Sequence, residues 1–478
     1  MPNHYPDREL NAPDPPSSNQ ELLRQLTLGG VAYSVSDRER AEHGRDWWPI
    51  TIPEVARGRV PLWPGVVVHP TSTSQVSDVL RIANSLGIAV TAQGGRSGVT
   101  GGALAPAGAV ALDLTTLDRI VAIDAISGTV SVEAGVFGPE LEAVLTAAGL
   151  TLGHFPQSFA LSTVGGWLAC RGAGQYSNRY GKIEDIVRGL TVVLASGEVV
   201  HVGGPGPRQA TGPDLVQLFV GSEGTLGVIT EATLVVRTRP DHEQRRAFCF
   251  SSFDDGLDSC RRILQRGAHP AVLRLYDERE SARHFDVEGC ALLVLDEGDP
   301  LLVGATIAVV DQECTRAAAL NESVVAKWLA HRNDVGSLGE LWERGLVVDT
   351  MEVAGRWAHL KTIQARVRAA LEALPETIVV TVHQSHAYSD GACLYFTFAG
   401  RPEGDPTSYY RRAWDGATYA ALDAGASLSH HHGVGRNRAR FMSAALGSAF
   451  PLLQSLKSTL DPTSTLNPGV LGLGGEAW

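Results

Sequence analysis

The sequence lacks the features that mark secreted, zinc-binding and membrane proteins. Its six cysteines lie far apart without a C-x-x-C pair, which indicates reduced thiols rather than a disulfide scaffold or a zinc finger. No run approaches the roughly 18 apolar residues that a membrane-spanning helix needs. The opening residues, MPNHYPDREL, lack the apolar core of a secretory signal and the arginine-rich pattern of a targeting peptide. We therefore expect a cytoplasmic protein with no transmembrane segment.

Positive charge is also scarce, since 40 Lys and Arg stand against 52 Asp and Glu, for a net charge of −12. Proteins that bind nucleic acid concentrate Lys and Arg to displace counterions, so this composition argues against nucleic acid as a partner. The apolar share of 44% and the charged share of 19% are ordinary for a globular protein. A chain of 478 residues exceeds what one hydrophobic core serves, and we expect at least two packed units.

Glycine, by contrast, is abundant, with 52 residues in the chain against the roughly 7% typical of globular proteins. Much of the local excess lies in GGRSGVTGG at residues 94–102, between strand patterns at Ile88–Thr91 and Ala109–Leu114. A nicotinamide-binding glycine loop opens a helix instead, so that mode of binding is disfavoured. Consecutive amides in a glycine-rich turn can converge on a phosphate without a helix. The loop alone is thus either an anion-binding nest or an ordinary wide turn.

The residues before this loop predict a strand and a helix. Val66–Val68 is β-branched, and Gln75–Leu86 places its apolar residues on one helical face. Thr73 or Ser74 can cap the start of the helix, and Gly87 can end it in the left-handed conformation.

Two further segments are dense in glycine and hydroxyl residues, at 162–174 and 221–229. Independent turns would not need small residues and hydroxyls in each segment. An extended ligand with phosphate and ring parts needs several close approaches to the backbone. Three such segments in one region therefore favour a ligand site over wide turns.

Long, ordered stretches of the chain resemble a known flavoprotein family. These stretches are LGHFPQSFALSTVGGWLACRGAGQYSNRYGKIEDIV at 152–187, GPRQATGPDLVQLFVGSEGTLGVITEATL at 206–234 and SLSHHHGVG at 427–435. They resemble the FAD-linked oxidases of the vanillyl-alcohol oxidase and p-cresol methylhydroxylase superfamily, and within it alkyldihydroxyacetonephosphate synthase. The resemblance spans about residues 61 to 468.

The resemblance implies an α+β fold, with a two-subdomain FAD-binding domain of the p-cresol methylhydroxylase (PCMH) type and a cap domain containing an antiparallel sheet. We expect a helical or irregular lead at residues 1–57, the FAD-binding domain at 58–240 and the substrate cap at 241–450. Residues 451–478 are expected to return to the FAD-binding domain.

The resemblance also implies which residues contact FAD. Ser97 stands where covalent relatives carry histidine, so we expect non-covalent FAD. The expected contacts are Ala92, Gln93, Gly94, Gly95, Arg96, Ser97, Gly98, Gln157, Ser158, Phe159, Ala160, Leu161, Ser162, Thr163, Cys170, Arg171, Gly172, Ala173, Glu223, Gly224, Thr225, Leu226, Gly227, Val228 and Ile229.

Catalytic roles follow from the same resemblance. Tyr395 matches the proton donor or acceptor of the family, Arg274 matches an important arginine, and the three histidines match an essential triplet, His430, His431 and His432. Such groups suit the oxidation of a carbon beside oxygen or nitrogen, because a nearby group must take a proton as flavin N5 accepts the hydride. Without the resemblance, Arg274 reads as a surface ion pair with Asp277 or Glu278, and Tyr395 as a core residue.

The chain departs from the synthase pattern at several positions. Ungapped counting places Leu338 and Gly339 where the synthase has an Arg-Asp pair that binds the phosphate of the substrate. Arg332 or Arg344 can replace that arginine if the loop is gapped. Gln157 stands in place of aspartate, Arg96 stands in place of a third glycine, and the cap is shorter than in the synthase.

We predict no metal ion. Three adjacent histidines cannot all face one ion from a regular strand or helix. The metal-binding D-2-hydroxyacid dehydrogenases of the superfamily carry H-x-x-D-G-N-x-H, whereas here the segment 386–393 reads HAYSDGAC and His431 takes the glutamate position. His154 is open to two readings, as a functional group or as a buried core histidine.

The leading prediction is an FAD-dependent oxidoreductase, similar to alkyldihydroxyacetonephosphate synthase, acting on a small or lipid-like substrate. The first alternative is a true synthase of ether-lipid biosynthesis, a redox-neutral transferase that exchanges an acyl for an alkyl group. The second is a D-2-hydroxyacid dehydrogenase, and a third is a flavin-binding protein without catalysis. A homodimer would be common for the family.

Overall fold

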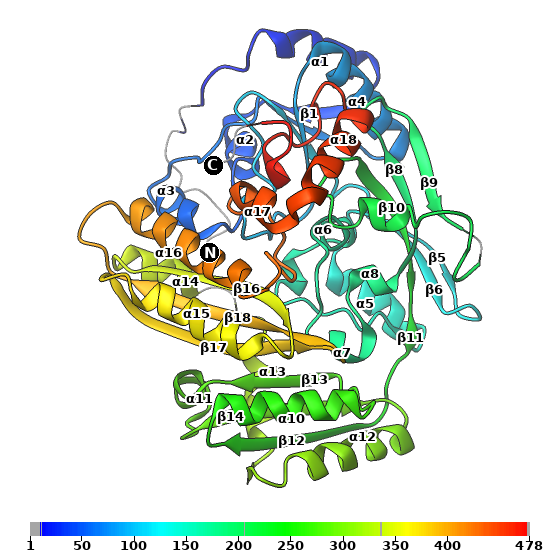
Figure 1. Ribbon diagram of the computed structural model, residues 1–478. Coiled ribbons are helices and arrows are strands. Elements are labelled where there is room, and N and C mark those ends of the chain that lie inside the picture. The colour runs from blue at the N-terminus through cyan, green and yellow to red at the C-terminus, as the bar shows by residue number, and fades with distance from the viewer. Residues whose placement is uncertain (1–9, 11, 205, 335–336, 476–478) are drawn as a thin grey trace.

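The described strands form three large sheets and one two-stranded sheet, and Figure 1 shows the seven-stranded sheet in the lower half of the molecule, below the four- and five-stranded ones. The computed structural model describes residues 10, 12–204, 206–334 and 337–475, without the side chains of 56 and 337–339. Mixed helices and antiparallel strands agree with the predicted α+β class.

The first sheet has four strands, and its central pairings are parallel. Helix α4 (Thr73–Leu86) packs its apolar face over it together with α1 (Ser18–Leu28). The predicted caps Thr73 and Ser74 are wrong, because Ser72 has the extended backbone of a cap and accepts from the Gln75 amide at 3.2 Å. Gly87 ends the helix with φ of 66°, as predicted. The strand order is β1 (Ala32–Ser34), β2 (Val66–His69), β4 (Val110–Asp113) and β3 (Val90–Gln93).

The second sheet has five antiparallel strands, and an apolar core separates it from its covering helices. Its order is β5 (Ile120–Asp124), β6 (Thr129–Glu133), β10 (Val228–Val235), β8 (Val187–Val193) and β9 (Val199–Gly203). The accompanying elements are α5 (Gly138–Ala147), β7 (Leu150–Thr151), η2 (Phe159–Leu161), α6 (Val164–Cys170), α7 (Ser177–Tyr180), α8 (Ile183–Ile186), α9 (Val216–Phe219) and β11 (Arg237–Thr238).

The third sheet has seven antiparallel strands, and its two faces differ. One face packs against α10 (Phe253–Gln265), α12 (Pro300–Glu313), α15 (Leu360–Glu372) and α16 (Pro406–Asp423) through the largest apolar cluster. The other face carries α11 (Glu278–Phe285), α13 (Ser323–His331) and many polar side chains. The order is β15 (Ala318–Leu320), β12 (Glu243–Phe250), β14 (Cys290–Glu297), β13 (Val272–Tyr276), β17 (Thr377–Ala387), β18 (Gly391–Gly400) and β16 (Val347–Arg356).

Most of the remaining elements lie near the two ends of the chain, and α14 lies before β16. Leu466 bridges to Val90 beside the first sheet, and the Lys457 ammonium donates to the Thr225 carbonyl at 2.9 Å. The predicted border at residue 240 falls between β11 and β12, and the domain borders themselves stay predictions. These elements are α2 (Asp37–His43), η1 (Pro49–Thr51), α3 (Ile52–Ala56), α14 (Ser337–Glu343), η3 (Ala439–Phe441), α17 (Met442–Leu446), η4 (Gly447–Ala449), α18 (Phe450–Leu460) and η5 (Val470–Gly472).

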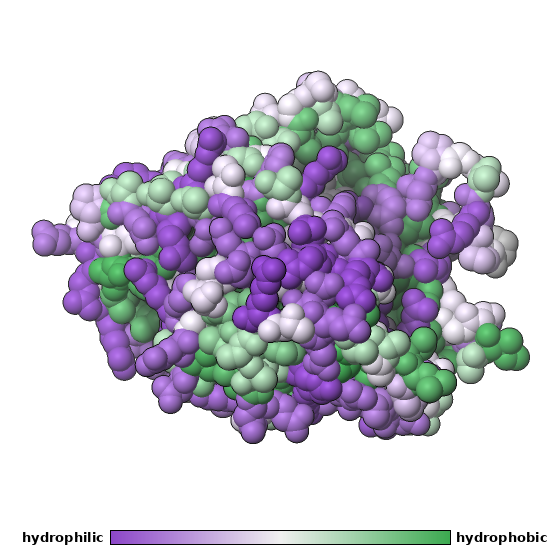
Figure 2. All heavy atoms as spheres, turned by 60° about the horizontal axis from the view of Figure 1, so that its bottom comes forward, coloured by the Kyte–Doolittle hydropathy of each residue, from purple (hydrophilic) through white to green (hydrophobic). Residues whose placement is uncertain are grey.

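The molecular surface on the side of the seven-stranded sheet and its helices is mostly hydrophilic, and Figure 2 shows its hydrophobic residues in separate groups. Leu301 and Leu302 at the start of α12 are among the exposed apolar residues. Among the described residues, no helix combines the length and the apolar character that crossing a membrane requires.

Candidate functional site

One cavity of about 820 Å³ lies between the glycine-rich segments and the polar face of the seven-stranded sheet. Most of the residues predicted to contact FAD line it. These are Ala92, Gln93, Gly94, Gly95, Arg96, Ser97, Gly98, Gln157, Ser158, Leu161, Ser162, Thr163, Cys170, Gly172, Ala173, Glu223, Gly224, Gly227, Val228 and Ile229.

Five predicted contacts do not line the cavity. The Phe159 ring stacks on Trp167, and Arg171 turns outward to donate to Gln217 at 2.6 Å. Thr225 and Leu226 are buried in the protein interior. The side chains of these residues lie outside the cavity wall, and their contact with FAD stays a prediction. The fifth is Ala160.

The glycine loop is held by direct backbone contact with its neighbours. A Cβ atom on Gly95 would lie 1.9 Å from the Leu161 carbonyl oxygen, and one on Gly94 would lie 2.2 Å from Thr163 Oγ1. Within the described chain, no acceptor takes a hydrogen bond from the amides of Gly95, Arg96, Ser97 or Gly98. Free amides beside an open cavity fit the diphosphate of FAD.

The polar face of the third sheet places four polar side chains in one row. Tyr276, His383, Tyr395 and Glu352 are direct neighbours across β13, β17, β18 and β16. Direct cross-strand neighbours point to the same face of a sheet, so their side chains lie together although the sequence separates them widely. A register shift between Gln384 and His386 adds a residue to β17. This bulge directs both Ser385 and His386 to the cavity.

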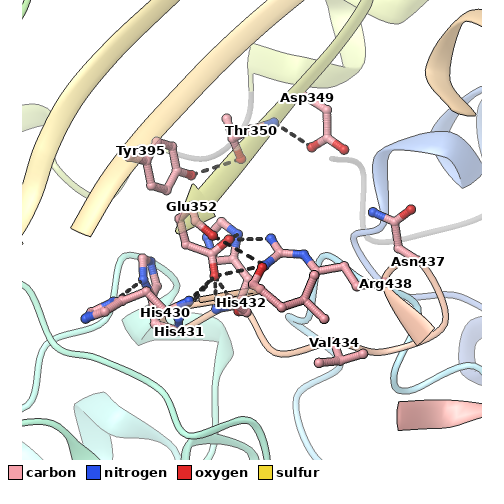
Figure 3. A network of polar contacts seen from close by, with 12 residues as sticks. Asp349, Thr350, Glu352, Tyr395, His430, His431, His432, Val434, Asn437 and Arg438 are labelled. Carbon is pink, nitrogen blue, oxygen red and sulfur yellow. Dashed lines mark hydrogen bonds and ion pairs between the residues drawn. The ribbon is translucent and has the colours of Figure 1, made fainter. Parts of the chain in front are cut away.

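Tyr395 lies within the cavity on β18. Its hydroxyl donates to Thr350 Oγ1 at 3.0 Å (Figure 3). Its ring stacks on His383 with centroids 4.8 Å apart. Burial raises the pKa of Tyr395 well above its usual value of 10.0, although the Thr350 hydroxyl opposes the shift. The phenol is therefore protonated at neutral pH and can act as a donor before it acts as an acceptor.

The histidine loop, residues 430–435, lies between two buried carboxylates and is hydrogen-bonded to both. On the cap side, Glu352 Oε1 accepts from the successive amides of His430, His431 and His432 at 3.1, 3.1 and 2.9 Å. On the other side, Glu223 accepts from the amides of Val434 and Gly435 at 2.6 and 2.8 Å. These bonds fix the backbone of the loop and therefore the directions of its imidazoles.

The two carboxylates differ in charge state. Burial disfavours the ionised form of Glu352. The ion pair with Arg438 and, to a smaller extent, the nearby His432 outweigh this effect and hold the pKa of Glu352 well below its usual value. Figure 3 shows Arg438 and the histidines on opposite sides of this carboxylate. Burial raises the pKa of Glu223 to about 7, and its two backbone donors oppose the rise. Glu352 is thus a fixed anion, and Glu223 titrates near neutral pH.

Two imidazoles of the loop, those of His430 and His431, are neutral at pH 7. Burial lowers the pKa of His430 to about 3, and the nearby Lys182 adds to the effect. Burial and the neighbouring His432 lower the pKa of His431 well below its usual value. Only His431 and His432 of the triplet line the cavity, since His430 Nε2 lies 2.9 Å from the Tyr388 hydroxyl outside it. A neutral imidazole beside Tyr395 can accept a proton.

Three histidines could hold a metal ion. Ring nitrogens of His386, His430 and His431 lie within 4.8 Å of one another, because the bulge in β17 brings His386 beside the loop. The cluster contains no carboxylate, and His430 Nδ1 lies 2.9 Å from His431 Nδ1, as in a hydrogen bond between the rings. The Lys182 ammonium also donates to the His430 carbonyl. These features disfavour a cation, and the expectation of no metal stays a prediction.

The structure decides between two readings of Arg274. The side chain is 9% exposed and forms no ion pair with Asp277 or Glu278, so the surface reading is wrong. Its Nε donates to the Tyr276 hydroxyl at 3.1 Å, and its Nη2 donates to His383 Nε2 at 3.0 Å. Arg274 therefore lies in the cavity wall, next to Tyr276 and His383.

His154 is buried against Trp167, with ring centroids 4.9 Å apart, and does not line the cavity. Within the described residues, neither of its ring nitrogens has a hydrogen-bond partner. Burial lowers the pKa of His154 to about 3, so the ring is neutral. These features agree with the reading as a buried core histidine.

Several cavity residues were not singled out from the sequence. His383, Thr350 and Trp328 reach the cavity only through strand pairing and helix packing, and no local motif marks them. His386 stands in the segment that was compared with a metal motif, which is the one signal that could have identified it.

Comparisons with known proteins agree with this geometry. Residues 64–203 match the family described as "FAD binding domain", and residues 239–471 match "FAD linked oxidases, C-terminal domain". An "Uncharacterized FAD-linked oxidoreductase" of Escherichia coli (strain K12) is 30% identical over 430 residues, covering 85% of this chain and 89% of the relative. "Alkyldihydroxyacetonephosphate synthase" of Caenorhabditis elegans is 28% identical, covering 94% and 83%.

Solved structures share the fold. A structure of alkyldihydroxyacetonephosphate synthase matches with a TM-score of 0.79 and 24% identity, covering 98% of this chain and 91% of the other. A structure of p-cresol methylhydroxylase with bound substrate matches with a TM-score of 0.74 and 17% identity, covering 95% and 97%. The chain therefore belongs to the FAD-linked oxidase family, as an enzyme that depends on FAD.

Proposed function

We propose that this enzyme oxidises a carbon adjacent to oxygen or nitrogen in a small or lipid-like substrate. The carrying observation is that the buried Tyr395 hydroxyl and the neutral His431 line the same cavity as the glycine loop. The predicted FAD contacts that line the cavity would hold the cofactor there. FAD supplies the hydride acceptor, and the protein supplies the proton acceptor.

His431 and Tyr395 are the residues that act on the proton of the substrate. Because burial and a neighbouring imidazole keep His431 neutral, it can take the proton from a substrate O–H or N–H group. Tyr395, whose hydroxyl donates to Thr350, can orient the same group by a hydrogen bond. Glu352 contributes by fixing the loop and contacts no substrate atom in this scheme.

The test is Tyr395→Phe, which removes one hydroxyl and keeps the ring that stacks on His383. Loss of the hydroxyl that orients the reacting group should lower kcat by roughly 10²-fold, with flavin content and melting temperature nearly unchanged. Tyr419→Phe is the matched control, because Tyr419 is 49% exposed, outside the cavity. Equal turnover in the wild type and in Tyr395→Phe would contradict the proposal.

A second candidate is a true alkyldihydroxyacetonephosphate synthase, favoured by relatives of that name that cover most of the chain. A third is a D-2-hydroxyacid dehydrogenase, since "D-lactate dehydrogenase [cytochrome], mitochondrial" of Arabidopsis thaliana is 27% identical over 482 residues. A place in lipid metabolism would follow only from the second. The homodimer and the cytoplasmic location stay predictions.

Anaerobic mixing separates these candidates. A dehydrogenase bleaches its flavin absorbance permanently when its substrate is added, so D-lactate and an acyl-dihydroxyacetone phosphate are mixed in separate runs. Permanent bleaching by either supports an oxidoreductase. Recovery of the oxidised spectrum after addition of a fatty alcohol to the acyl-dihydroxyacetone phosphate mixture would favour the synthase.

A further inference from the structure

A second cavity, of about 370 Å³, lies beside the histidine loop. Among the residues that the structure describes, it shares no lining residue with the main cavity, which is the cavity of about 820 Å³ beside the glycine loop. Its wall includes the buried Ser177 and the half-buried Tyr388, and also three exposed residues, Asp185, His269 and Ser389. The second cavity is therefore in contact with solvent.

A continuous series of hydrogen-bond distances joins the two cavities. His431 lines the main cavity, and its Nδ1 lies 2.9 Å from His430 Nδ1 (Figure 3). His430 Nε2 in turn lies 2.9 Å from the hydroxyl of Tyr388, which lines the second cavity. An imidazole has two nitrogens, and a phenol donates and accepts through one oxygen, so each of the three side chains can accept one proton and release another.

Backbone contacts hold these side chains in place. The Lys182 ammonium donates to the His430 carbonyl at 2.7 Å. The Trp357 indole donates to the Tyr388 carbonyl at 3.0 Å, and the Tyr388 amide donates to the Gly391 carbonyl at 2.8 Å. The His430 ring and the Tyr388 hydroxyl are therefore fixed within reach of each other.

A base in the main cavity needs an exit for the proton that it accepts. Burial lowers the pKa of His430 to about 3, and burial together with the nearby His432 lowers the pKa of His431 well below its usual value. Neither ring therefore keeps an added proton as a stable imidazolium at neutral pH. A bound substrate also displaces water from the main cavity, which removes the water that could otherwise take the proton there.

We propose that the proton that His431 takes from the substrate leaves through His430 and Tyr388 to water in the second cavity. This inference rests on the proposed function and deepens it by naming the exit of the proton. At rest, His431 carries its hydrogen on Nδ1 and His430 carries its hydrogen on Nε2. The oxygen of Tyr388 accepts from His430 Nε2.

The transfer conserves charge at every member of this proton relay. As His431 Nε2 takes the substrate proton, its Nδ1 hydrogen passes to His430 Nδ1. The His430 Nε2 hydrogen passes to the Tyr388 oxygen, and the Tyr388 hydroxyl hydrogen passes to water. Each side chain gains one proton and loses one, so no buried imidazolium forms. After the product leaves, water in the main cavity takes the hydrogen from His431 Nε2, and the reverse shift restores both tautomers.

The test measures proton exchange with water in holoenzyme that carries ¹⁵N-labelled histidine, by NMR and without substrate. The coupling across the Nδ1···Nδ1 hydrogen bond identifies the signals of His430 and His431. Tyr388→Phe removes the hydroxyl and keeps the ring. The His430 Nε2 hydrogen should then exchange at least about tenfold more slowly, because local opening is the route that remains. Loss of a merely structural bond would loosen the loop and make this exchange faster.

Two variants serve as controls. Tyr419→Phe changes a tyrosine that is 49% exposed and lines neither cavity, so exchange should equal that of the wild type. Ser177→Ala removes a hydroxyl that lies 2.8 Å from His386 Nδ1, which is a second contact between the walls of the two cavities. It should also leave the exchange of His430 unchanged. Slower exchange in Ser177→Ala, with unchanged exchange in Tyr388→Phe, would assign the exit to His386 and overturn the proposal.

Melting curves show whether each variant folds. If Tyr388→Phe does not fold, His430→Gln interrupts the relay one residue earlier, because an amide does not take up and release a proton. The His431 Nδ1 hydrogen should then exchange at least about tenfold more slowly. Unchanged or faster exchange in the variant that folds would overturn the relay.

Turnover gives a second readout with whichever of D-lactate and acyl-dihydroxyacetone phosphate bleaches the flavin. Tyr388→Phe should lower kcat at least about tenfold and leave KM unchanged, because Tyr388 lies outside the wall of the main cavity. Failure of the proposed function is distinguishable from failure of the relay. It appears as unchanged turnover in Tyr395→Phe, and it leaves the exchange of the His430 hydrogen unaffected.

Discussion

Removal of the charge of Glu352 should destabilise the protein much more than removal of the charge of an exposed glutamate. Glu352 and its partner Arg438 are both fully buried, and the same carboxylate accepts three amides of the histidine loop. Glu352→Gln keeps the volume of the side chain but leaves the Arg438 charge without its anion. Breaking a buried pair in this way costs about 3–5 kcal/mol.

A matched control is available in the same chain. Glu372 lies 3.8 Å from Arg279, and the side chains of this pair are 45% and 55% exposed. Glu372→Gln should cost at most about 1 kcal/mol, because water screens an exposed pair. The double variant Glu352→Gln/Arg438→Met should be less destabilised than the sum of its single changes, since the two charges are coupled.

The assay is urea unfolding of the holoenzyme, followed by far-ultraviolet circular dichroism, with flavin fluorescence as a check on cofactor loading. The pKa of Glu352 in the folded state lies below its usual value of 4.5. The stabilisation that ionised Glu352 contributes is therefore fully present above pH 4.5. This stabilisation is lost as the pH falls through the pKa that Glu352 has in the folded state. The difference in unfolding free energy between the wild type and Glu352→Gln should therefore be constant near neutral pH and become smaller below about pH 4.5. A cost equal to that of Glu372→Gln would refute the reasoning.

Three further predictions concern other parts of the molecule. Because the pKa of His154 falls from 6.5 to about 3 on folding, acidification from pH 7 to pH 5 should cost about 2 kcal/mol at this residue. His154→Phe should remove that part of the loss in urea titrations at the two pH values, and an unchanged loss would contradict the neutral assignment. Gly95→Ala should weaken FAD retention on gel filtration, because its Cβ would lie 1.9 Å from a carbonyl oxygen. Gly304→Ala on α12, where a Cβ meets open space, should retain FAD and gain about 0.5–1 kcal/mol of stability. Prolonged dialysis against a chelator should leave turnover unchanged, and activity that zinc restores after such treatment would show that the histidine cluster binds a metal.

Local patterns predicted the parts of the fold that depend on local chemistry. The order of strand, glycine loop and strand around Gly94–Gly102 excluded a helix-opening nucleotide loop, and the structure has β3 and β4 at those places. Hydroxyl and glycine content predicted that three segments share one cavity. The cap of α4 was predicted two residues or less from Ser72, because several hydroxyls in a row can each satisfy the same amide.

The sequence by itself predicted a ligand site in the first domain, because three of its segments are dense in glycine and hydroxyl residues. Tertiary structure alone decided the chemistry opposite them. Tyr395 meets Glu352 and His383 through strand register, and His386 enters through a bulge. The histidine loop is fixed by Glu352 on β16 and by Glu223 in the loop before β10. Register and burial depend on contacts between residues far apart in the chain, which no local pattern records.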